Sequence, residues 1–329
     1  MPQQQPNVTV NEPLYQHSNC HYNQNCTITD DDFTTTNLTF QLFIGTLYTI
    51  IFLLGVFGNV LVCFVVARNR QMQTVTNLFI TNLALSDVLL CVLAVPFTPL
   101  YTFLGSWTFG DTLCHLVPYA QGVSIYISTL TLTGIAIDRF LVILYPFRPR
   151  MKITTCLSII LTIWFVALLL TLPYGLYMKP LTEEKNSYCE EAWPDEPFRK
   201  IFSFFTSIMQ FAIPFVIIAV CYVCVSIRLN DRARMKPGNK SNRRDEADRE
   251  RKKRTNRMLI AMVAIFCISW SPLNIVNVVE DFYPPAMSWI YYKVLFFMAH
   301  CLAMSSTCYN PFLYAWLNDN FRKEFKQVC

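Results

Sequence analysis

Residues 47–54 read LYTIIFLL, and this unbroken apolar stretch decides the fold class. A strand of a membrane β-barrel would alternate apolar and polar residues at every second position, and this stretch does not alternate. Helices and closed barrels are the structures that satisfy their own backbone hydrogen bonds inside a bilayer. The stretch therefore predicts a membrane-spanning helix and, if the pattern recurs, an all-α membrane protein.

Similar segments recur along the chain, and each is long enough, at about 1.5 Å per residue, to cross a hydrocarbon core of about 30 Å. Only 15% of the 329 residues are charged, against about 25% in an average soluble domain. We therefore expect a bundle of seven transmembrane helices within residues 41–315. The segments are 41–67, 75–101, 111–145, 153–178, 199–229, 254–281 and 289–315.

The distribution of basic residues predicts the orientation of this bundle. The tail, 1–40, contains no Lys or Arg and lacks the pattern of a secretory signal. Basic residues accumulate on the cytoplasmic side of membrane proteins, so we expect an extracellular tail and a multi-pass protein of the plasma membrane. The tail carries glycosylation acceptors of the Asn-x-Thr type at Asn7, Asn25 and Asn37. Most of the 27 Lys and Arg residues lie in 68–74, 145–152, 228–257 and after 316.

The end of the chain, 316–329, has a different pattern. Residues 318–326, NDNFRKEFK, place apolar residues four apart among charged ones. This predicts a short amphipathic helix on the cytoplasmic membrane surface. Cys329 is a candidate palmitoylation site beside it. The basic connection between the fifth and sixth segments predicts contact with anionic membrane lipids, with a partner protein, or with both.

Asp87 lies in the middle of the second segment, where an ionisable side chain is costly and usually functional. Asn59 and Asn310 are expected to join it in a buried polar cluster. Ser128 and Ser306 would add oxygen atoms of the kind that hard cations prefer. We expect a sodium ion at Asp87, Ser128, Ser306 and Asn310, and the alternative is a hydrated hydrogen-bond network without an ion. No other cofactor is expected.

Seven short motifs follow one another, one on each predicted helix. With these motifs the chain resembles the rhodopsin-like G-protein-coupled receptors over nearly all of the seven segments. Two positions differ from the usual pattern: Phe140 replaces a commoner Tyr, and Lys252 stands in the region of an acid that often faces the arginine of helix 3. A strong ionic lock in the inactive state is therefore not expected. The motifs are GNV at 58–60, LALSD at 83–87, DRF at 138–140, Trp164, Pro214, SWSP at 269–272 and NPFLY at 310–314.

The resemblance implies a mechanism of signalling. Helix 6 would swing outwards about Trp270 and Pro272 and open a cytoplasmic cavity for a heterotrimeric G protein of the Gi/o class, with arrestin as a further partner. It also implies a disulfide between Cys114 and Cys189, while Cys20 and Cys26 are either a second pair or two free thiols. The side chains that would rearrange with helix 6 are Asp138, Arg139, Tyr222, Asn310, Pro311 and Tyr314.

Polar side chains near the outer end of the bundle indicate the ligand. Asn274, Asn277 and Asp281 follow Trp270 at helical spacing, so the four lie on one face. We expect an acid and several amides to converge on a cavity, with no cation of the protein beside the acid. Such a lining suits a ligand with a guanidinium and an amide, because Arg pairs bidentately with a carboxylate. The converging residues are Gln121, Gln210, Asn277, Asp281 and His300.

Further stretches narrow the resemblance. CHLVPYAQG at 114–122 and STLTLT at 128–133 resemble neuropeptide Y and neuropeptide F receptors, and AIDRF at 136–140 with YPFRPRM at 145–151 resembles their invertebrate short neuropeptide F branch. These receptors take the amidated Arg-aromatic end of a peptide. The resemblance implies that Asp281 pairs with the ligand Arg, that Tyr101 packs on the ligand, and that loop acids attract the basic peptide. It assigns the amidated end to Gln121, Gln210, Asn277 and His300, and the attraction to Glu190, Glu191 and Asp195.

Other functions fit the sequence less well. Gln121 stands where an amine receptor of the family has Asp, and Met304 where a retinal protein has Lys. The chain has no HExxH or GxSxG motif, so an enzyme is not expected, and neither is a nucleic-acid partner. The remaining alternatives are a receptor for another RFamide or prolactin-releasing-type peptide and, in a different class, a membrane transporter, which would more often show inverted repeats.

Overall fold

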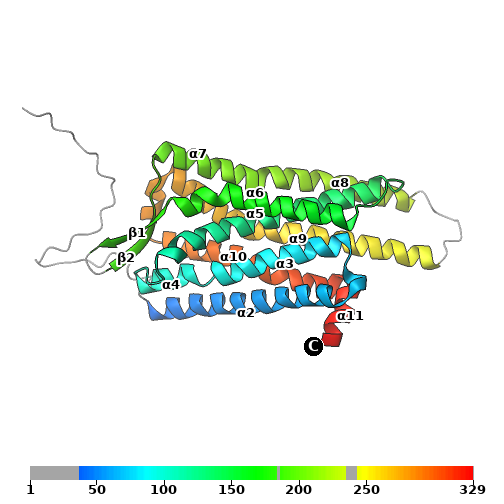
Figure 1. The fold of residues 1–329 in the computed structure, drawn as a ribbon, viewed down its shortest axis with the longest axis horizontal. Helices are drawn as coiled ribbons and strands as arrows, with labels where there is room; N and C mark the ends of the chain where they lie inside the picture. Colours follow the sequence, from blue (N-terminus) through cyan, green and yellow to red (C-terminus); the bar gives the residue numbers. More distant parts are fainter. Residues whose placement is uncertain (1–36, 184–185, 235–242, 329) are drawn as a thin grey trace, which may run out of the picture.

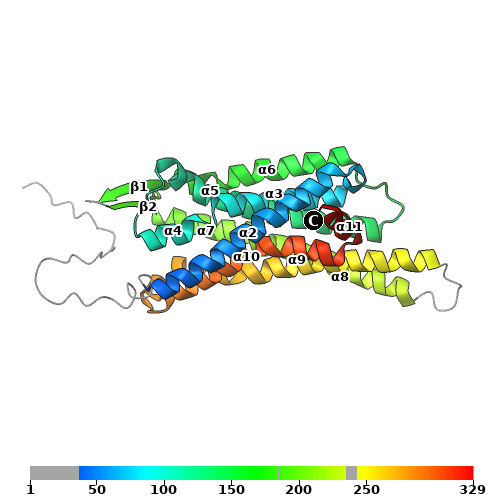
Figure 2. The same ribbon diagram turned by 90° about the horizontal axis from the view of Figure 1, so that it is seen from below.

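The computed structural model describes residues 37–183, 186–234 and 243–328. Long helices run side by side in one elongated bundle (Figure 1; Figure 2). A two-stranded hairpin lies at one end of the bundle, and the short helix α11, Asp319–Val328, lies near the other end (Figure 1). We call these the hairpin end and the α11 end.

Four of the seven predicted segments form single regular helices with nearly the predicted bounds. Helix α2 begins directly after Asn37, whose side-chain Oδ1 accepts the backbone N–H of Thr39 at 2.9 Å. This is an N-cap, which satisfies a backbone donor that has no partner inside the helix. The four helices are α2, Leu38–Arg68; α5, Asp111–Leu144; α6, Ile153–Leu176; and α10, Tyr292–Leu317.

The second segment is interrupted. Helix α3, Val75–Leu93, ends in a turn before Pro96, and α4, Phe97–Leu104, continues it. Proline has no N–H to donate and disfavours helical geometry in the preceding residue. The interruption turns the last part of this segment into a separate short helix at the hairpin end.

The fifth and sixth segments are longer than predicted. The fifth begins at α7, Glu196–Ser207, passes through a π-helical stretch, Ile208–Ala212, and continues as α8, Ile213–Arg234. In the π-helical stretch the N–H of Ile213 reaches the carbonyl of Ile208, immediately before Pro214, which has no N–H. The sixth segment is α9, Arg243–Phe282, which continues beyond its apolar part into the basic residues before 254.

The hairpin is an addition to the predicted all-helical architecture. Strand β1, Met178–Glu183, pairs antiparallel with β2, Asn186–Glu191, and Pro180 stands opposite Cys189. No strand was predicted because β1 contains a proline, which cannot donate to a strand ladder. Cys189 forms a disulfide with Cys114 of α5, with Cα atoms 5.6 Å apart. The hairpin is thereby fixed to the bundle.

Six spans in the described part of the chain are long and apolar enough to cross a membrane. They are Leu38–Arg68, Val75–Leu104, Asp111–Leu144, Ile153–Leu176, Glu196–Arg228 and Lys253–Phe282. Helix α10 is not among them because polar residues such as His300, Thr307 and Asn310 lie in its middle. It is 26 residues long, and it lies among the other helices of the bundle as the seventh (Figure 2).

Polar contacts between helices hold the bundle together. Asn82 of α3 donates to Thr131 of α5 and accepts the indole N–H of Trp164 in α6, both at 2.8 Å. Asn59 of α2, expected to join the cluster at Asp87, instead donates to the carbonyl of Thr307 in α10 at 2.9 Å. Hydrogen bonds of this kind contribute to helix association in lipid, where apolar surfaces alone are not driven together by water.

Candidate ligand-binding site

Asp281 lies at the hairpin end of α9, and other side chains engage both of its carboxylate oxygens. Arg199 of α7 contacts Oδ1 through Nη1 at 2.6 Å, and the hydroxyl of Ser203 donates to Oδ2 at 2.5 Å. The prediction that no cation of the protein faces this acid is therefore wrong. The reason is that α7 begins at Glu196, so Arg199 and Ser203, four residues apart, point from one helical face to α9. That spacing is visible in the sequence, but it does not show that this face of α7 is turned towards α9.

Further acids surround the pair formed by Arg199 and Asp281. Glu196, which is 70% exposed, lies 3.5 Å from Nη2 of Arg199. Glu280 accepts a hydrogen bond from the hydroxyl of Tyr292 at 2.9 Å. A cation that approaches this end of the bundle therefore meets carboxylates beyond Asp281 itself.

Glu191, predicted to attract the ligand, is exposed at the end of β2. Its carboxylate accepts the indole N–H of Trp193 at 2.7 Å. The Trp193 ring packs on Tyr177 of the α6 end, with ring centroids 4.6 Å apart, and on Phe202 of α7 at 5.4 Å. Aromatic packing thus fixes the segment that leads from the hairpin into α7.

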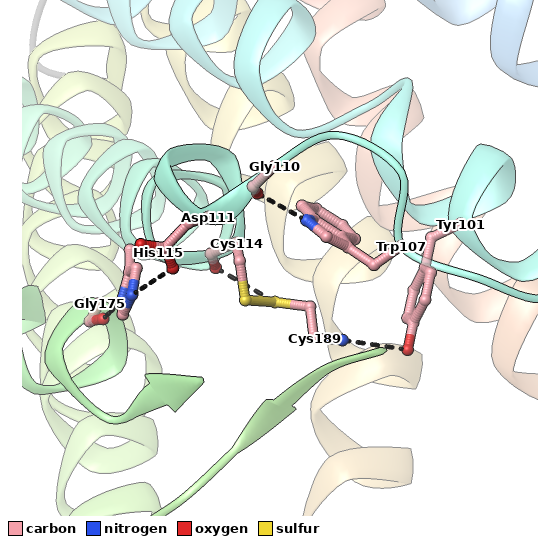
Figure 3. Close-up of a disulfide and its surroundings, with 8 residues drawn as sticks. All are labelled: Tyr101, Trp107, Gly110, Asp111, Cys114, His115, Gly175 and Cys189. Atoms are coloured by element: carbon pink, nitrogen blue, oxygen red, sulfur yellow. Dashed lines mark hydrogen bonds and ion pairs between the residues drawn. A yellow bond between two sulfur atoms is a disulfide. The ribbon is translucent and has the colours of Figure 1, made fainter. Parts of the chain in front are cut away.

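Tyr101 of α4 supports the hairpin. Its hydroxyl accepts the backbone N–H of Cys189 at 3.4 Å, and its ring packs edge-on against Trp107 with centroids 5.3 Å apart. Trp107 in turn donates its indole N–H to the carbonyl of Gly110 at 2.8 Å. Figure 3 shows these residues around the disulfide between Cys114 and Cys189. The contact of Tyr101 with a ligand stays a prediction.

The four residues predicted to hold the amidated end have different surroundings. His300 is buried, with Nδ1 2.6 Å from the hydroxyl of Tyr48, a partner that the sequence did not predict. Gln210 is buried on the π-helical stretch, Gln121 is half-buried on α5 and Asn277 is exposed on α9. Within the described chain no hydrogen bond joins any two of the four, so their shared role stays a prediction.

Two grooves lie elsewhere on the bundle. One lies between α9 and α10 and the other between the α11-end parts of α5 and α8. Neither is lined by a residue that was predicted to bind the ligand, so the charges and contacts at the hairpin end identify the candidate site. The lining residues are Ile265, Tyr309, Phe312, Leu313, Ala315 and Trp316 in the first groove, and Leu144, Tyr145, Cys224, Ile227 and Arg228 in the second.

Trp270, a predicted switch residue, connects three helices in the middle of the bundle. It is buried, and its ring lies 5.9 Å from that of Phe266 and 6.3 Å from that of Phe211 in the π-helical stretch. Its indole N–H donates to Ser306 of α10 at 3.1 Å. Pro272 interrupts the hydrogen bonds of α9 one turn or less away. A movement of Trp270 would therefore change its contacts with α9, with α10 and with the π-helical stretch before α8.

Asp87 is buried in α3 and accepts a hydrogen bond from Asn310 of α10 at 2.9 Å, which confirms that part of the predicted polar cluster. The two predicted serine ligands have other hydrogen-bond partners. The hydroxyl of Ser128 pairs with that of Ser86 at 2.9 Å, and the hydroxyl of Ser306 accepts the indole N–H of Trp270. Among the residues described, no three His, Cys, Asp or Glu side chains form a group that could hold a metal ion. A sodium ion held by one carboxylate with hydroxyl and amide oxygens needs no such group, and it stays a prediction.

Arg139, near the α11 end of α5, is held by its neighbours. Its guanidinium pairs with Asp138, with Nη2 and Oδ2 2.6 Å apart, and donates to the hydroxyl of Thr76 in α3. Of the ion pairs in the described chain, none joins Arg139 to α9. Tyr222 and Tyr314 are buried nearby in the same half of the bundle, and their hydroxyls have no hydrogen-bond partner in the described structure.

A different contact joins α9 to the end of α10. The guanidinium of Arg254 lies 2.9 Å from the carboxylate of Asp319, the first residue of α11, and donates to the carbonyl of Trp316 at 2.6 Å. Helix α11 itself packs through Phe321, which is fully buried and stacks on Tyr314 with centroids 5.2 Å apart. The sequence predicted the amphipathic helix but not its link to α9.

Most of the predicted modification sites cannot be placed. Asn37 is exposed and caps α2. The other glycosylation, palmitoylation and disulfide candidates of the tail and the C-terminus lie outside the described residues: Asn7, Asn25, Cys20, Cys26 and Cys329.

Comparison with known proteins agrees with this architecture. A family model described as the 7 transmembrane receptor (rhodopsin family) matches residues 58–314. Neuropeptide Y receptor type 6 of Mus musculus is 36% identical over 294 residues, which cover 85% of this chain and 78% of that receptor. Neuropeptide Y receptor type 2 of Cavia porcellus is 36% identical over 286 residues, 84% of this chain and 74% of that receptor. The neuropeptide F receptor of Drosophila melanogaster is 36% identical over 299 residues, 86% of this chain and 61% of that receptor.

Proposed function

Because the chain belongs to the rhodopsin family of seven-transmembrane receptors, we propose that it is a G-protein-coupled receptor for an amidated neuropeptide with a basic and aromatic C-terminus. The similarity to receptors named for neuropeptide Y and neuropeptide F supports this class of ligand. The family is one of membrane receptors and not of enzymes, and the chain crosses the membrane several times.

One observation carries the choice of a basic ligand. Asp281 is buried at the hairpin end of α9, and it holds a guanidinium, that of Arg199, at 2.6 Å. The same carboxylate therefore has the geometry and the surroundings to receive the guanidinium of a peptide. Charge-assisted hydrogen bonds of this type are among the stronger polar contacts in proteins.

The other predicted residues would complete the site. Glu190, Glu191 and Asp195 would attract the basic peptide as it approaches, since acids near a binding site raise the rate of encounter with a cation. Tyr101, on α4 beside the hairpin, would pack on the ligand. The amidated end would be held by four polar side chains: Gln121, Gln210, Asn277 and His300.

Binding would be transmitted to the α11 end as a shift between two populations of the receptor. A ligand that reaches the middle of the bundle would displace Trp270, and α9 would pivot near Pro272. Arg139 would leave Asp138 and Thr76, and a cavity would open for a heterotrimeric G protein of the Gi/o class. Arrestin would use the same opening. Further side chains of this rearrangement would be Tyr222, Asn310, Pro311 and Tyr314.

A sodium ion would stabilise the resting receptor at Asp87. The carboxylate of Asp87 is the buried anion of the cluster, and Asn310, Ser128 and Ser306 would supply the remaining oxygen atoms. Asp87→Asn removes the charge that holds the cation. We expect agonist affinity to fall with added sodium in the wild type and to be independent of sodium in Asp87→Asn, measured by radioligand binding with N-methylglucamine as the replacement cation.

We place the hairpin end outside the cell and the α11 end in the cytoplasm, at the plasma membrane. The basic residues after 316 and between α8 and α9 support this orientation. Glycans would then be carried at Asn7, Asn25 and Asn37, and Cys329 would be palmitoylated and would hold α11 against the anionic lipids of the inner leaflet.

G-protein activation in cells tests the proposal. The receptor is expressed and exposed to amidated peptides ending in Arg-Phe or Arg-Tyr, with and without pertussis toxin. We expect a nanomolar response that the toxin abolishes. In Asp281→Asn the response should need about tenfold more peptide or worse, because losing a charged hydrogen-bond partner costs about 1.5–3 kcal/mol.

Asp111→Asn is the matched control, since it removes one negative charge from the same end of the bundle at an exposed position on α5. It should leave the potency nearly unchanged. Silence of the wild type to every Arg-Phe and Arg-Tyr peptide, with the receptor shown at the cell surface, would exclude this ligand class. A response to other RFamide or prolactin-releasing-type peptides alone would move the assignment to those ligands.

A further inference from the structure

The candidate anchor for a ligand arginine is already occupied by an arginine of the protein. Asp281 accepts from Arg199 at one carboxylate oxygen and from Ser203 at the other. The side chain of Asp281 is 7% exposed and that of Arg199 is 24% exposed. A ligand guanidinium cannot bind this carboxylate in bidentate fashion while both contacts persist.

We propose that Arg199 is a placeholder that occupies the carboxylate of Asp281 in the empty receptor and is displaced by the guanidinium of the ligand. The inference rests on the proposed function, since it concerns the same site. A buried carboxylate without a cation is strongly destabilising. The placeholder removes that penalty from the empty receptor, and the ligand then exchanges one guanidinium for another.

Glu196 is the residue that would receive the displaced side chain. It precedes Arg199 by one turn of α7, is 70% exposed, and lies 3.5 Å from Nη2 of Arg199, whereas Nη1 of the same guanidinium holds Asp281 at 2.6 Å. Arg199 thus bridges an exposed and a buried acid. A change of side-chain rotamer moves it wholly to Glu196 without movement of the helix.

This exchange determines how strongly the receptor distinguishes an arginine ligand from a neutral one. In the wild type, an arginine ligand gains its contact with Asp281 only after the contact of Arg199 is lost. A neutral ligand leaves Arg199 in place, so its binding does not require the loss of the contact between Arg199 and Asp281. Removing the guanidinium of Arg199 should therefore raise the affinity for the arginine ligand and widen its advantage over a neutral analogue.

The test uses the full receptor and two peptides, an amidated Arg-Phe peptide that activates the wild type and the same peptide with citrulline in place of that arginine. In Arg199→Gln we expect the affinity for the arginine peptide to rise on the order of tenfold, since charged hydrogen bonds have that magnitude. Affinity for the citrulline peptide should stay constant. Lys200→Gln is the matched control, because it removes one positive charge from the next residue of α7, whose side chain forms no ion pair in the described chain. It should alter both affinities little.

Glu196 supplies the second arm. Glu196→Gln should lower the affinity for the arginine peptide in the wild-type background. It should have no effect in the Arg199→Gln background, where no guanidinium is displaced towards residue 196. An equal loss in both backgrounds would show that Glu196 only attracts the peptide, and would overturn the exchange.

A thermal-stability measurement keeps the inference testable without a peptide. Purified Arg199→Gln should melt at a lower temperature than the wild type, and millimolar argininamide should raise its melting temperature more than that of the wild type. Arg199→Lys keeps a cation but lacks the planar guanidinium, so it should fold. Its melting temperature, and the rise in melting temperature with argininamide, should lie between those of the wild type and Arg199→Gln. If no peptide activates the wild type but argininamide stabilises Arg199→Gln selectively, the proposed peptide class fails and the placeholder stands. Argininamide that stabilises all variants equally, or a lower peptide affinity in Arg199→Gln, would show that Arg199 only links α7 to α9.

Discussion

At the scale of single residues, Gly58 shows how closely two helices approach. A Cβ atom at this position in α2 would lie 2.8 Å from Cγ of Pro311 in α10. A proline ring cannot turn aside as a flexible side chain can, so any side chain larger than hydrogen would push the two helices apart. The glycine is therefore required by the packing of α2 against α10, next to the motif that leads to Tyr314.

We expect Gly58→Ala to lower the free energy of unfolding by about 1–3 kcal/mol, the usual effect of overpacking. The melting temperature of the purified receptor in detergent measures it. Gly45→Ala, in the same helix, is the control because its Cβ would meet nothing within 4 Å, and alanine favours a helix more than glycine does. Equal melting temperatures for the two variants would show that α2 and α10 adjust to the extra methyl group.

The sequence predicted the positions of single residues well where those positions depend on the residue's own helix. Helical spacing placed Asp281 on the same face as Trp270, and the order of motifs located Asp87 and Arg139. The partners of these residues were harder to predict. Arg199 meets Asp281, Tyr48 meets His300 and Thr76 meets Arg139 only because of how neighbouring helices are rotated and where each begins, and these depend on the whole packing.

At the scale of elements, the apolar segments predicted the helices because a membrane span must be apolar along its length. The features inside them follow from local backbone chemistry that hydropathy does not report. Pro96 divides α3 from α4, and the π-helical stretch Ile208–Ala212 precedes Pro214. The hairpin escaped prediction because its short polar strands are stabilised by a disulfide to α5 and not by a pattern of their own.

Cys114→Ala should release this hairpin without unfolding the bundle. The disulfide, the contact of Cys189 with Tyr101 and a backbone hydrogen bond from Trp107 to Ser187 join β2 to α5, to α4 and to the segment between them. We expect peptide potency to fall by about tenfold or more, because ordering the hairpin on binding would consume part of the binding free energy. Dose–response curves at matched surface expression measure this loss.

Cys63→Ala is the control for Cys114→Ala, because Cys63 is a free, half-buried thiol of α2. It should leave peptide potency unchanged. Retained potency in Cys114→Ala would show that the hairpin is held in place without the covalent bond.

At the scale of the whole molecule, the two ends are joined through α9. Its hairpin end is held by Arg199 of α7, its middle by Trp270 against α10, and its α11 end by the contacts of Arg254 with Asp319 and Trp316. An outward swing of the α11 end of α9 must break the contacts of Arg254 with Asp319 and Trp316. Arg254 thus holds α9 in a receptor in which no ion pair between described side chains joins Arg139 to that helix.

Asp319→Asn should therefore raise signalling without ligand. The ion pair is partly exposed, with 37% and 49% of the two side chains accessible, so it contributes no more than about 1 kcal/mol. We expect basal G-protein activation to rise about two- to fivefold, measured by GTPγS binding at matched receptor density. Lys253→Gln should have no such effect, because Lys253 pairs with Glu250 inside α9. A basal rate like that of the wild type in Asp319→Asn would show that the pair is broken freely at rest.

The disulfide also carries information about how the chain was made. Cys114 and Cys189 are 75 residues apart, and a ribosome that adds about 5–20 residues per second needs roughly 4–15 s to synthesise the second after the first. In the proposed orientation, α6 must cross back through the bilayer before the bond can form, because only then does Cys189 reach the compartment that holds Cys114. A chain in which α6 failed to insert would keep the two thiols on opposite sides of the membrane. The bond can therefore form only in a chain whose first four spans have crossed the bilayer in the correct order.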